Sequence, residues 1–523
     1  MKKLLFTFII SLLFSVGCQN ILKEEIVSGI TAQKYYTDGN GINAALITGY
    51  ATLKEYFGRQ AGSFNDAGTD MYGDARGTWA KPAHQYDGTL NSSWLLLRDA
   101  WKSFYKAINV YNTVIKRAPE VIHDQKELNK VLGEARFLRG FVYFYLVQIW
   151  GDVHLTTEET IGVELEANRT PAQEIYNKLI IPDLDFAIAN LPQTTTDFGR
   201  ATQPAAKAVR AEVAMVLQDW ATASQLAQSV IKDYPNLKLT KTYKELWDMN
   251  NEKNSEVIWS VQFSKDPLIS GANENNNLWT PWYSKHKGLR NSPYNGGTWV
   301  GMKPTPYFYR LWNKAIDRRF EEGLKSVWYA DAPGGPPIGD TALYYSIDIL
   351  TAADKASRRY VVYDLNDLIA DDAAWPQPYK VRDESRTDNS IKPSRDVVIV
   401  RVAEMYLIVA EAEFHQGNMN VALDYMNTLR RQRAWDTKKT DMEITPAKLD
   451  LDFILDEWAR ELFAEGKRWF TLKRLGLLVS RVKLYNPYGL AAKEIKEYHN
   501  LRPIPLEQID RTLNGYPQNP GYN

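Results

Sequence analysis

The chain has 523 residues, and its 63 basic and 63 acidic side chains give a formal net charge of zero. This balance argues against a nucleic acid as the main partner, because phosphate binding needs a basic excess or a basic stripe. The length is enough for several domains or for one large composite domain.

The chain begins with the pattern of a lipoprotein signal peptide. Lys2 and Lys3 precede an apolar run over residues 4–14, which is far shorter than the about 20 residues that span a bilayer. Small residues then lead into Cys18, the only cysteine of the chain. We predict a signal peptide over residues 1–17 and a lipid on Cys18. An ordinary secretory signal followed by an incidental cysteine is the alternative. An acylated Cys18 leaves no thiol for a disulfide, for catalysis or for a metal.

Residues 18–40 have no clear periodicity, and we expect them to be a tether between the lipid and the folded domain. A helix is expected to begin near Gly41 and to continue to Phe57. Residues 58–90 are rich in Gly, Asp, Asn and Thr, which indicates a loop. Apolar residues at three- and four-residue steps then predict a series of helices. They cover residues 94–112 and, after a break near Pro119, 132–146, and then fall near 171–190, 203–217, 219–233, 402–416, 419–433, 449–465 and 467–480.

Two pairs of these helices share one pattern, in which alanines precede a short turn and a bulky ring follows it. The turns are Gln218-Asp219 and Gly417-Asn418, and the rings are Trp220 and Tyr425. Tetratricopeptide (TPR) units have such an arrangement, although a generic antiparallel helix pair also places small residues where the helices cross. We therefore expect a mainly α fold in which residues 41–235 and 397–523 form a TPR-like superhelix of helical hairpins.

Residues 236–396 form a large, irregular, loop-rich insert between these helical parts. The insert is full of Asn, Gly, Pro and Trp, and short β-prone pieces occur at 257–263 and 359–363. A stretch this long is unusual as a plain linker, and its many aromatic residues argue against disorder. Because irregular segments on a rigid scaffold commonly carry function, we expect the ligand-binding region here.

Several motifs, in a fixed order along the chain, resemble the SusD/RagB family of outer-membrane lipoproteins from Bacteroidetes. Each motif is weak alone, but together they are specific and cover the whole chain. They are EARFLRGF at 134–141, LVQIWGDV at 146–153, RVAEMYLIVAEA at 401–412, RELFAEGKRWF at 460–470 with LKR at 472–474, and RPIP at 502–505 with QNPGY at 518–522.

The resemblance implies a cell-surface protein held in the outer membrane by its lipid. Such proteins capture glycans and pass them to a SusC-like TonB-dependent transporter, on which they sit as a lid, and they perform no chemistry. It therefore implies a non-enzymatic protein without catalytic residues, cofactor or metal. The acidic Lys23-Glu24-Glu25 after Cys18 is similar to the signal that sends such lipoproteins to the cell surface. The shared motif residues, among them Arg139, Asp152 and Arg468, are expected to hold helices together through buried charges.

Two loop regions combine aromatic rings with hydrogen-bonding side chains, which is what a sugar ligand requires. Rings stack on the C–H faces of a sugar, while amides, carboxylates and guanidinium groups bind its hydroxyls. In the family, ligand contacts come from loops in these two regions. The predicted ligand-binding residues are Asp70, Asp74, Arg76 and Trp79 in the first loop and Asn277, Trp279, Trp282, Tyr283 and Trp299 in the second. Trp375 is a further candidate.

Several alternatives remain open at this point. Asp70 and Asp74 could cap helices or bind calcium, although their spacing does not match an EF-hand loop. A glycoside hydrolase needs only two suitably placed carboxylates, but 63 acidic residues make such proximity uninformative. The ligand could also be a peptide, as the RagB branch allows, or the helices could serve mainly as a TPR-type scaffold for other proteins.

Overall fold

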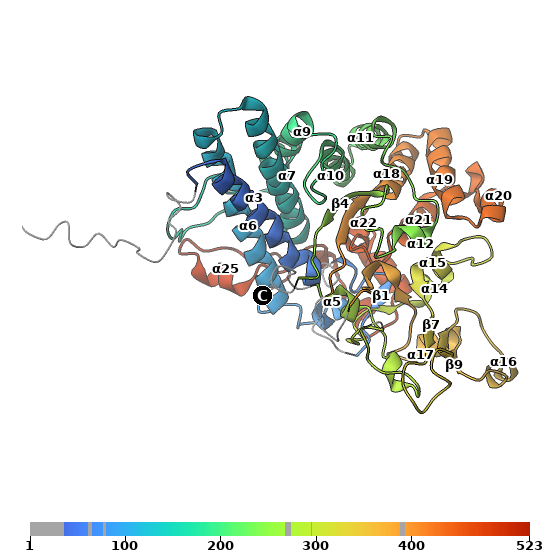
Figure 1. Cartoon of the computed structure of the whole chain (residues 1–523). Coiled ribbons are helices and arrows are strands. Elements are labelled where there is room, and N and C mark those ends of the chain that lie inside the picture. Colours follow the sequence, from blue (N-terminus) through green and yellow to red (C-terminus); the bar gives the residue numbers. More distant parts are fainter. Residues whose placement is uncertain are drawn as a thin grey trace, which may run out of the picture.

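The computed structural model describes residues 36–60, 65–76, 80–266, 273–293, 295–386 and 393–522 (Figure 1). The predicted lipidation site Cys18, most of the predicted tether and Trp79 lie outside these residues. Within the described part of the chain, no helix combines the length and the apolar character needed to cross a membrane.

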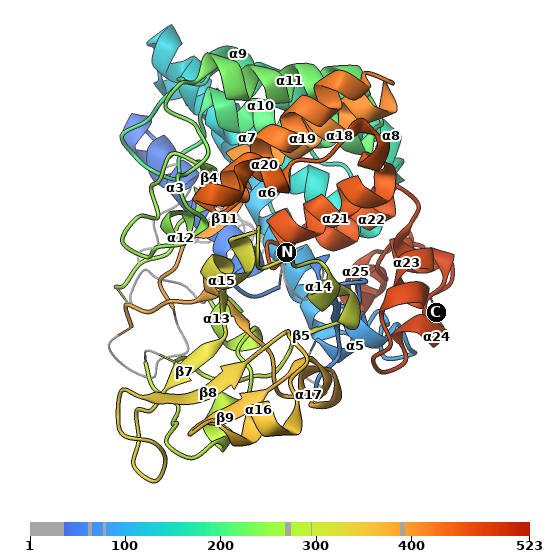
Figure 2. The same ribbon diagram turned by 90° about the vertical axis from the view of Figure 1, so that its right-hand side faces the viewer.

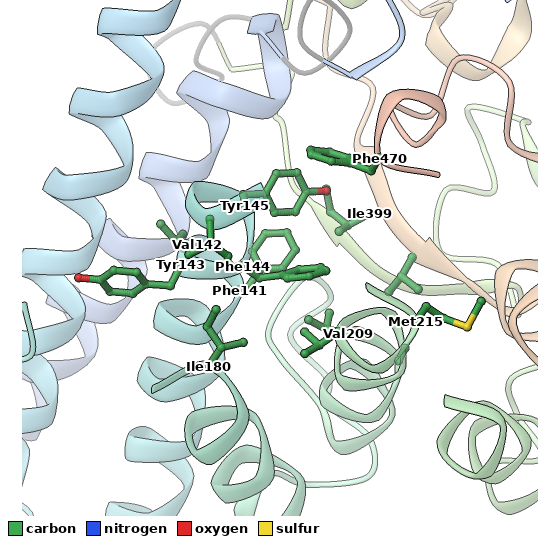
Figure 3. Close-up of a cluster of buried hydrophobic side chains, with 14 of the residues drawn as sticks. Phe141, Val142, Tyr143, Phe144, Tyr145, Ile180, Val209, Met215, Ile399 and Phe470 are labelled. Atoms are coloured by element: carbon green, nitrogen blue, oxygen red, sulfur yellow. The ribbon is translucent and has the colours of Figure 1, made fainter. Parts of the chain in front are cut away.

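The N-terminal half is built on three long helices. They are α3 (Gly39–Glu55), α6 (Leu95–Val121) and α7 (Gln125–Trp150). Asp124 caps α7 by accepting a hydrogen bond from the Glu127 N–H. Every residue from 141 to 150 of α7 is buried, so this helix is the centre of the helical part. Figure 3 shows how its aromatic side chains pack against residues that are distant in sequence, and the rings of Tyr145 and Phe470 lie 5.5 Å apart.

The two TPR-like helix pairs lie side by side. One pair is α10 (Gln203–Val216) and α11 (Trp220–Asp233), and the other is α18 (Val402–His415) and α19 (Met419–Arg433). Helix α11 packs against α18 (Figure 2). The Trp220 ring stacks on the His415 ring, and the two ring centres are 4.2 Å apart. Hairpins on opposite sides of the insert therefore form one continuous helical array, which confirms the predicted fold class.

One predicted helix is divided in two. Residues 467–480 form α22 (Arg468–Arg474) and the start of α23 (Leu478–Tyr485), because Gly476 adopts a left-handed conformation with φ of 68° and ends α22. The stretch predicted near 171–190 consists of α8 (Ala172–Ile175), a π-helical turn and α9 (Ile181–Asn190). The other helices are α5 (Lys81–Gln85), α12 (Tyr243–Leu246), α13 (Asn275–Leu278), α14 (Pro306–Arg310), α15 (Arg319–Gly323), α16 (Ala352–Ala356), α17 (Leu365–Ala370), α20 (Lys439–Met442), α21 (Leu451–Leu462), α24 (Ala491–Glu494) and α25 (Leu506–Arg511).

The strands are short, as expected, and most of them lie in the insert. Strand β4 (Val257–Val261) pairs with β11 (Val397–Arg401), so the beginning and the end of the insert meet. Strand β8 (Thr341–Tyr345) lies between β7 (Val327–Tyr329) and β9 (Val361–Tyr363) in the only three-stranded sheet of the described residues. The remaining pairs are β1 (Tyr72–Gly73) with β5 (Lys303–Pro304), β2 (Val153–His154) with β3 (Arg169–Thr170), and β6 (Leu324–Lys325) with β10 (Gln377–Pro378).

Buried ion pairs occupy the predicted motif positions. Glu461 lies within 2.6–2.9 Å of three buried arginines, Arg319, Arg401 and Arg433. Arg139 binds Asp183 at 2.7 Å, which confirms its expected role in helix packing. The prediction is wrong for Asp152, which is exposed and accepts a hydrogen bond from the Ala172 N–H at the start of α8.

Candidate ligand-binding surface

The two loop regions predicted to bind a ligand meet at Arg76 and Trp282. The Arg76 guanidinium lies over the Trp282 ring, 4.7 Å from the ring centre, and the Arg76 side chain is exposed. The Trp282 side chain retains 38% of its accessible surface. An exposed contact of this kind contributes about 0.5–1 kcal/mol, so the guanidinium can move aside when a ligand arrives.

Buried residues hold the backbone of Trp282 in place. Its backbone N–H donates to the Ala373 carbonyl at 2.8 Å. Ala373 belongs to a small buried cluster with Val300 and Trp375, against which Ala75 packs. Trp282 and Ala75, the residue before Arg76, are therefore both attached to this cluster. Trp375, the further candidate, is completely buried and has a supporting role.

Trp279 and Tyr283 are core residues, contrary to the expectation that their rings face solvent. Trp279 is 2% exposed and makes an edge-to-face contact with Tyr72, with ring centres 4.6 Å apart. Its carbonyl accepts a hydrogen bond from the indole of Trp375 at 3.0 Å. Tyr283 is fully buried, and its hydroxyl donates to the Gly296 carbonyl at 2.7 Å. Both side chains support the surface from within.

Asn277 and Asp70 are also buried, so their side chains do not face solvent as expected. The backbone carbonyl of Asn277 accepts a hydrogen bond from the backbone N–H of Trp299 at 3.0 Å, and the Asn277 side chain is buried. Asn277 therefore holds the second loop in place and does not face solvent. Asp70 accepts hydrogen bonds from Arg468 and Arg481. Burial alone would raise the pKa of Asp70, but these two guanidinium groups outweigh it and lower the pKa. A carboxylate that is already engaged by two arginines offers little to a calcium ion.

Asp74 and Trp299 lie at the edge of this surface. Asp74 is half-buried and accepts a hydrogen bond from the Gln85 amide at 2.5 Å. Trp299 is half-buried and directly precedes Val300 of the supporting cluster. Both positions are compatible with contact to a bound molecule.

Polar residues that sequence reasoning missed adjoin Trp282. Asp371 and Asp372 directly precede Ala373, and the Asp372 side chain is 58% exposed. Lys285 binds Asp371 at 2.5 Å, and Lys303 binds Asp372 at 2.7 Å. Burial favours a higher pKa for Asp371, but hydrogen bonds from Lys285 and the Ala373 N–H lower it, so this carboxyl is ionised at neutral pH. The sequence signal for these two carboxylates is the Asp-Asp-Ala-Ala-Trp segment at residues 371–375, of which only Trp375 was predicted to contact a ligand.

This arrangement suits the binding of a polyhydroxylated molecule. An indole ring offers an apolar face to stack against, and the exposed Asp372 carboxylate and Arg76 guanidinium can form charge-assisted hydrogen bonds with a ligand. Among the described residues, no cluster of three or more His, Cys, Asp or Glu side chains could hold a metal ion.

Known proteins of one family resemble this chain over most of its length. The family model described as "SusD family" matches residues 255–522, and one described as "Starch-binding associating with outer membrane" matches residues 49–217. A SusD-like protein, P25, from Formosa agariphila is 25% identical over 98% of this chain and 99% of its own length. The starch-binding protein SusD of Bacteroides thetaiotaomicron is 25% identical over 74% of this chain and 72% of its own. A solved structure of a laminarin-binding SusD-like protein has a TM-score of 0.71 at 22% identity, covering 93% of this chain and all of the other.

The fold and the matches define the class, which is that of SusD-like proteins. The chain belongs to the SusD/RagB family. No enzyme family is indicated by these matches.

Proposed function

We propose that this protein is a lipid-anchored, cell-surface glycan-binding protein. It captures oligosaccharides at the surface formed by Arg76, Trp282 and Trp299 and delivers them to a SusC-like TonB-dependent transporter without altering them. Asp74, Asp371 and Asp372 surround this surface and bind the sugar hydroxyls.

The observation that carries the proposal is the partly exposed Trp282 ring with ionised groups beside it. A pyranose can stack on the indole while its hydroxyls reach Asp371, Asp372 and the displaced Arg76 guanidinium. The starch and laminarin named in the descriptions of related proteins are both glucose polymers, which makes glucans the first ligands to examine.

A surface built on one stacking ring is expected to bind weakly. Millimolar affinity corresponds to only about −4 kcal/mol. The apparent affinity would rise if neighbouring copies of the protein bound several sugar units of one glycan, or if the transporter retained the glycan.

The direct experiment is isothermal calorimetry of the purified chain with a panel of soluble oligosaccharides, with short peptides as the comparison. Binding to at least one glycan series, with no change in the sugar after prolonged incubation, is the expected result. Binding to peptides alone would contradict the glycan proposal, and release of shorter sugars would contradict the non-catalytic role.

A further inference from the structure

The second loop of the ligand-binding surface is positively charged. Residues 275–303 contain four basic side chains and no acidic one, although the whole chain has equal numbers of both. The four are Lys285, Lys287, Arg290 and Lys303. His286 adds no charge at neutral pH, because burial lowers its pKa to about 4. A local excess of one charge in a chain of zero net charge produces a potential that attracts ligands of the opposite charge.

Two of these four charges are neutralised by the segment that adjoins Trp282. Lys285 binds Asp371, and Lys303 binds Asp372. Each of these two carboxylates therefore has its own ammonium partner from the loop. They leave the other two cations of the loop without a matching anion.

The side chains of Lys287 and Arg290 are exposed. Among the described residues, neither side chain forms an ion pair or a hydrogen bond. The nearby Asp331 carboxylate is used by the loop in another way, since it accepts the backbone N–H of Arg290 at 3.0 Å and the Asn295 amide at 3.1 Å. Asp331 thus fixes the backbone of the loop, while the Arg290 guanidinium stays available to a ligand.

Arg76, from the first loop, is a third exposed cation of this kind. Within the part of the chain that the structure describes, its guanidinium contacts the Trp282 ring and forms no hydrogen bond or ion pair. Asp74, two residues earlier, accepts a hydrogen bond from Gln85. The N–H donors of Arg76 are therefore open to a ligand beside the indole ring. A guanidinium binds an oxyanion through two parallel hydrogen bonds, which fixes both its position and its orientation.

A ligand that matches these features combines an apolar ring face with anionic groups. A pyranose that carries a carboxylate or a sulfate ester has both, because its C–H face can stack on Trp282 while its oxyanion binds Arg76. An acidic peptide supplies carboxylates, but on flexible side chains and without a rigid ring to stack on the indole. The surface therefore favours a sugar over a peptide.

We propose that the ligand of this surface is an anionic glycan, whose uronate carboxylates or sulfate esters bind Arg76, Lys287 and Arg290 while one sugar ring stacks on Trp282. Arg76 binds the stacked unit, and the two cations of the second loop bind neighbouring units of the same glycan. This inference rests on the proposed glycan-binding function and narrows the ligand to acidic glycans. The starch and laminarin named for related proteins are neutral, so they provide the opposing case.

Isothermal calorimetry of the purified chain with matched ligand pairs tests this proposal. One pair is an oligogalacturonate and its methyl ester, and the other is a sulfated galactan oligosaccharide and its desulfated form. Neutral glucan oligosaccharides and an oligoglutamate peptide complete the panel. At least one acidic glycan should bind at least tenfold more tightly than its uncharged derivative, and this advantage should shrink as NaCl is raised from about 50 to about 500 mM. The pair that responds identifies the anion as carboxylate or sulfate.

Each other outcome of the panel counts against the proposal. Equal affinities within both pairs, binding of neutral glucans alone, or tighter binding of oligoglutamate would overturn it while leaving this surface a binding site. Absence of binding by every glycan would contradict the glycan-binding function itself, and the proposal with it.

A variant assigns the effect to Arg76. Arg76→Gln should bind the acidic glycan at least tenfold more weakly and with a smaller salt dependence, while its melting temperature stays unchanged. The control is Arg358→Gln, because the Arg358 guanidinium is also exposed and lies 5.7 Å from the centre of the Tyr360 ring, between α16 and β9. The control should bind like the wild type. Unchanged affinity in Arg76→Gln, or an equal loss in Arg358→Gln, would overturn the proposal.

Discussion

Asp70 and Arg468, which are 398 residues apart in sequence, are joined by two hydrogen bonds of 2.6 and 2.8 Å. Arg481 adds a third to the same carboxylate at 2.7 Å. All three side chains are buried. This contact fastens the loop that carries Arg76 to helices α22 and α23, so the C-terminal helices determine where one half of the ligand-binding surface lies.

Asp70→Ala is predicted to destabilise the protein by about 3–5 kcal/mol, because it leaves two buried guanidinium groups without their anion. The measurement is denaturant unfolding followed by circular dichroism. Asp452→Ala is the matched control, since Asp452 binds the same Arg481 at 3.0 Å but is 84% exposed, and it should cost less than about 1 kcal/mol. Similar losses in both variants would contradict a special role for the buried carboxylate.

Trp279→Ala is predicted to act on stability. Its ring is buried against Tyr72, and removal of such a ring typically costs about 3–5 kcal/mol. Trp282→Ala, three residues further on, should change the free energy of unfolding much less because its ring is partly exposed. Calorimetric melting of both variants distinguishes them, and a Trp279→Ala protein that melts like the wild type would show that this ring is not part of the core.

Asp396→Asn is predicted to remove part of the pH dependence of stability. Burial raises the pKa of the Asp396 carboxyl to about 7, against an opposing hydrogen bond from the Phe263 N–H and with a further rise from Glu252. The pKa of an unfolded Asp is about 3.9, so the folded state binds more protons between pH 4 and 7 and becomes less stable as the pH rises through this range.

Asparagine keeps an acceptor for the Phe263 N–H but does not ionise. The variant should therefore match the wild type near pH 4 and exceed its stability above pH 7, by up to about 4 kcal/mol. Urea unfolding at a series of pH values measures this difference. A constant difference between the two proteins from pH 4 to 8 would contradict the raised pKa.

The helical part of the fold was predictable because its signal is local. Apolar residues at helical spacing identified α10, α11, α18 and α19, and short polar turns identified the two hairpins. The contact between α11 and α18, in which Trp220 stacks on His415, was not predictable because the whole insert separates the two helices in sequence. The division between α22 and α23 was missed because a single glycine with positive φ decides it.

The ligand-binding surface was predictable by region but not by residue. Trp279 and Trp282 have the same chemistry in the same irregular loop, and no periodicity tells which ring faces inward. Their burial is decided by Tyr72 on one side and Ala373 on the other, both distant in sequence. Asp371 and Asp372 are brought close to Trp282 by the hydrogen bond between the Trp282 N–H and the Ala373 carbonyl, which sequence does not reveal.

Cys18→Ala is predicted to release the protein from the outer membrane, because the lipid on this residue would be its main hold on the bilayer. The measurement is fractionation of cells that produce the variant, with the wild type as the control. Continued membrane association after a high-salt wash, which removes peripheral contacts, would contradict lipid anchoring at Cys18.

The central claim is tested most directly by the glycan affinity of Trp282→Ala, measured by isothermal calorimetry. The control is Trp435→Ala, since Trp435 is also partly buried and has an arginine, Arg318, 5.4 Å from its ring centre, but lies after α19 on another part of the molecule. Removal of a stacking tryptophan is expected to weaken the binding free energy by about 2 kcal/mol, which corresponds to an affinity about 30-fold lower. We predict this loss for Trp282→Ala and unchanged binding for Trp435→Ala. Wild-type affinity in Trp282→Ala would contradict the proposed ligand-binding surface.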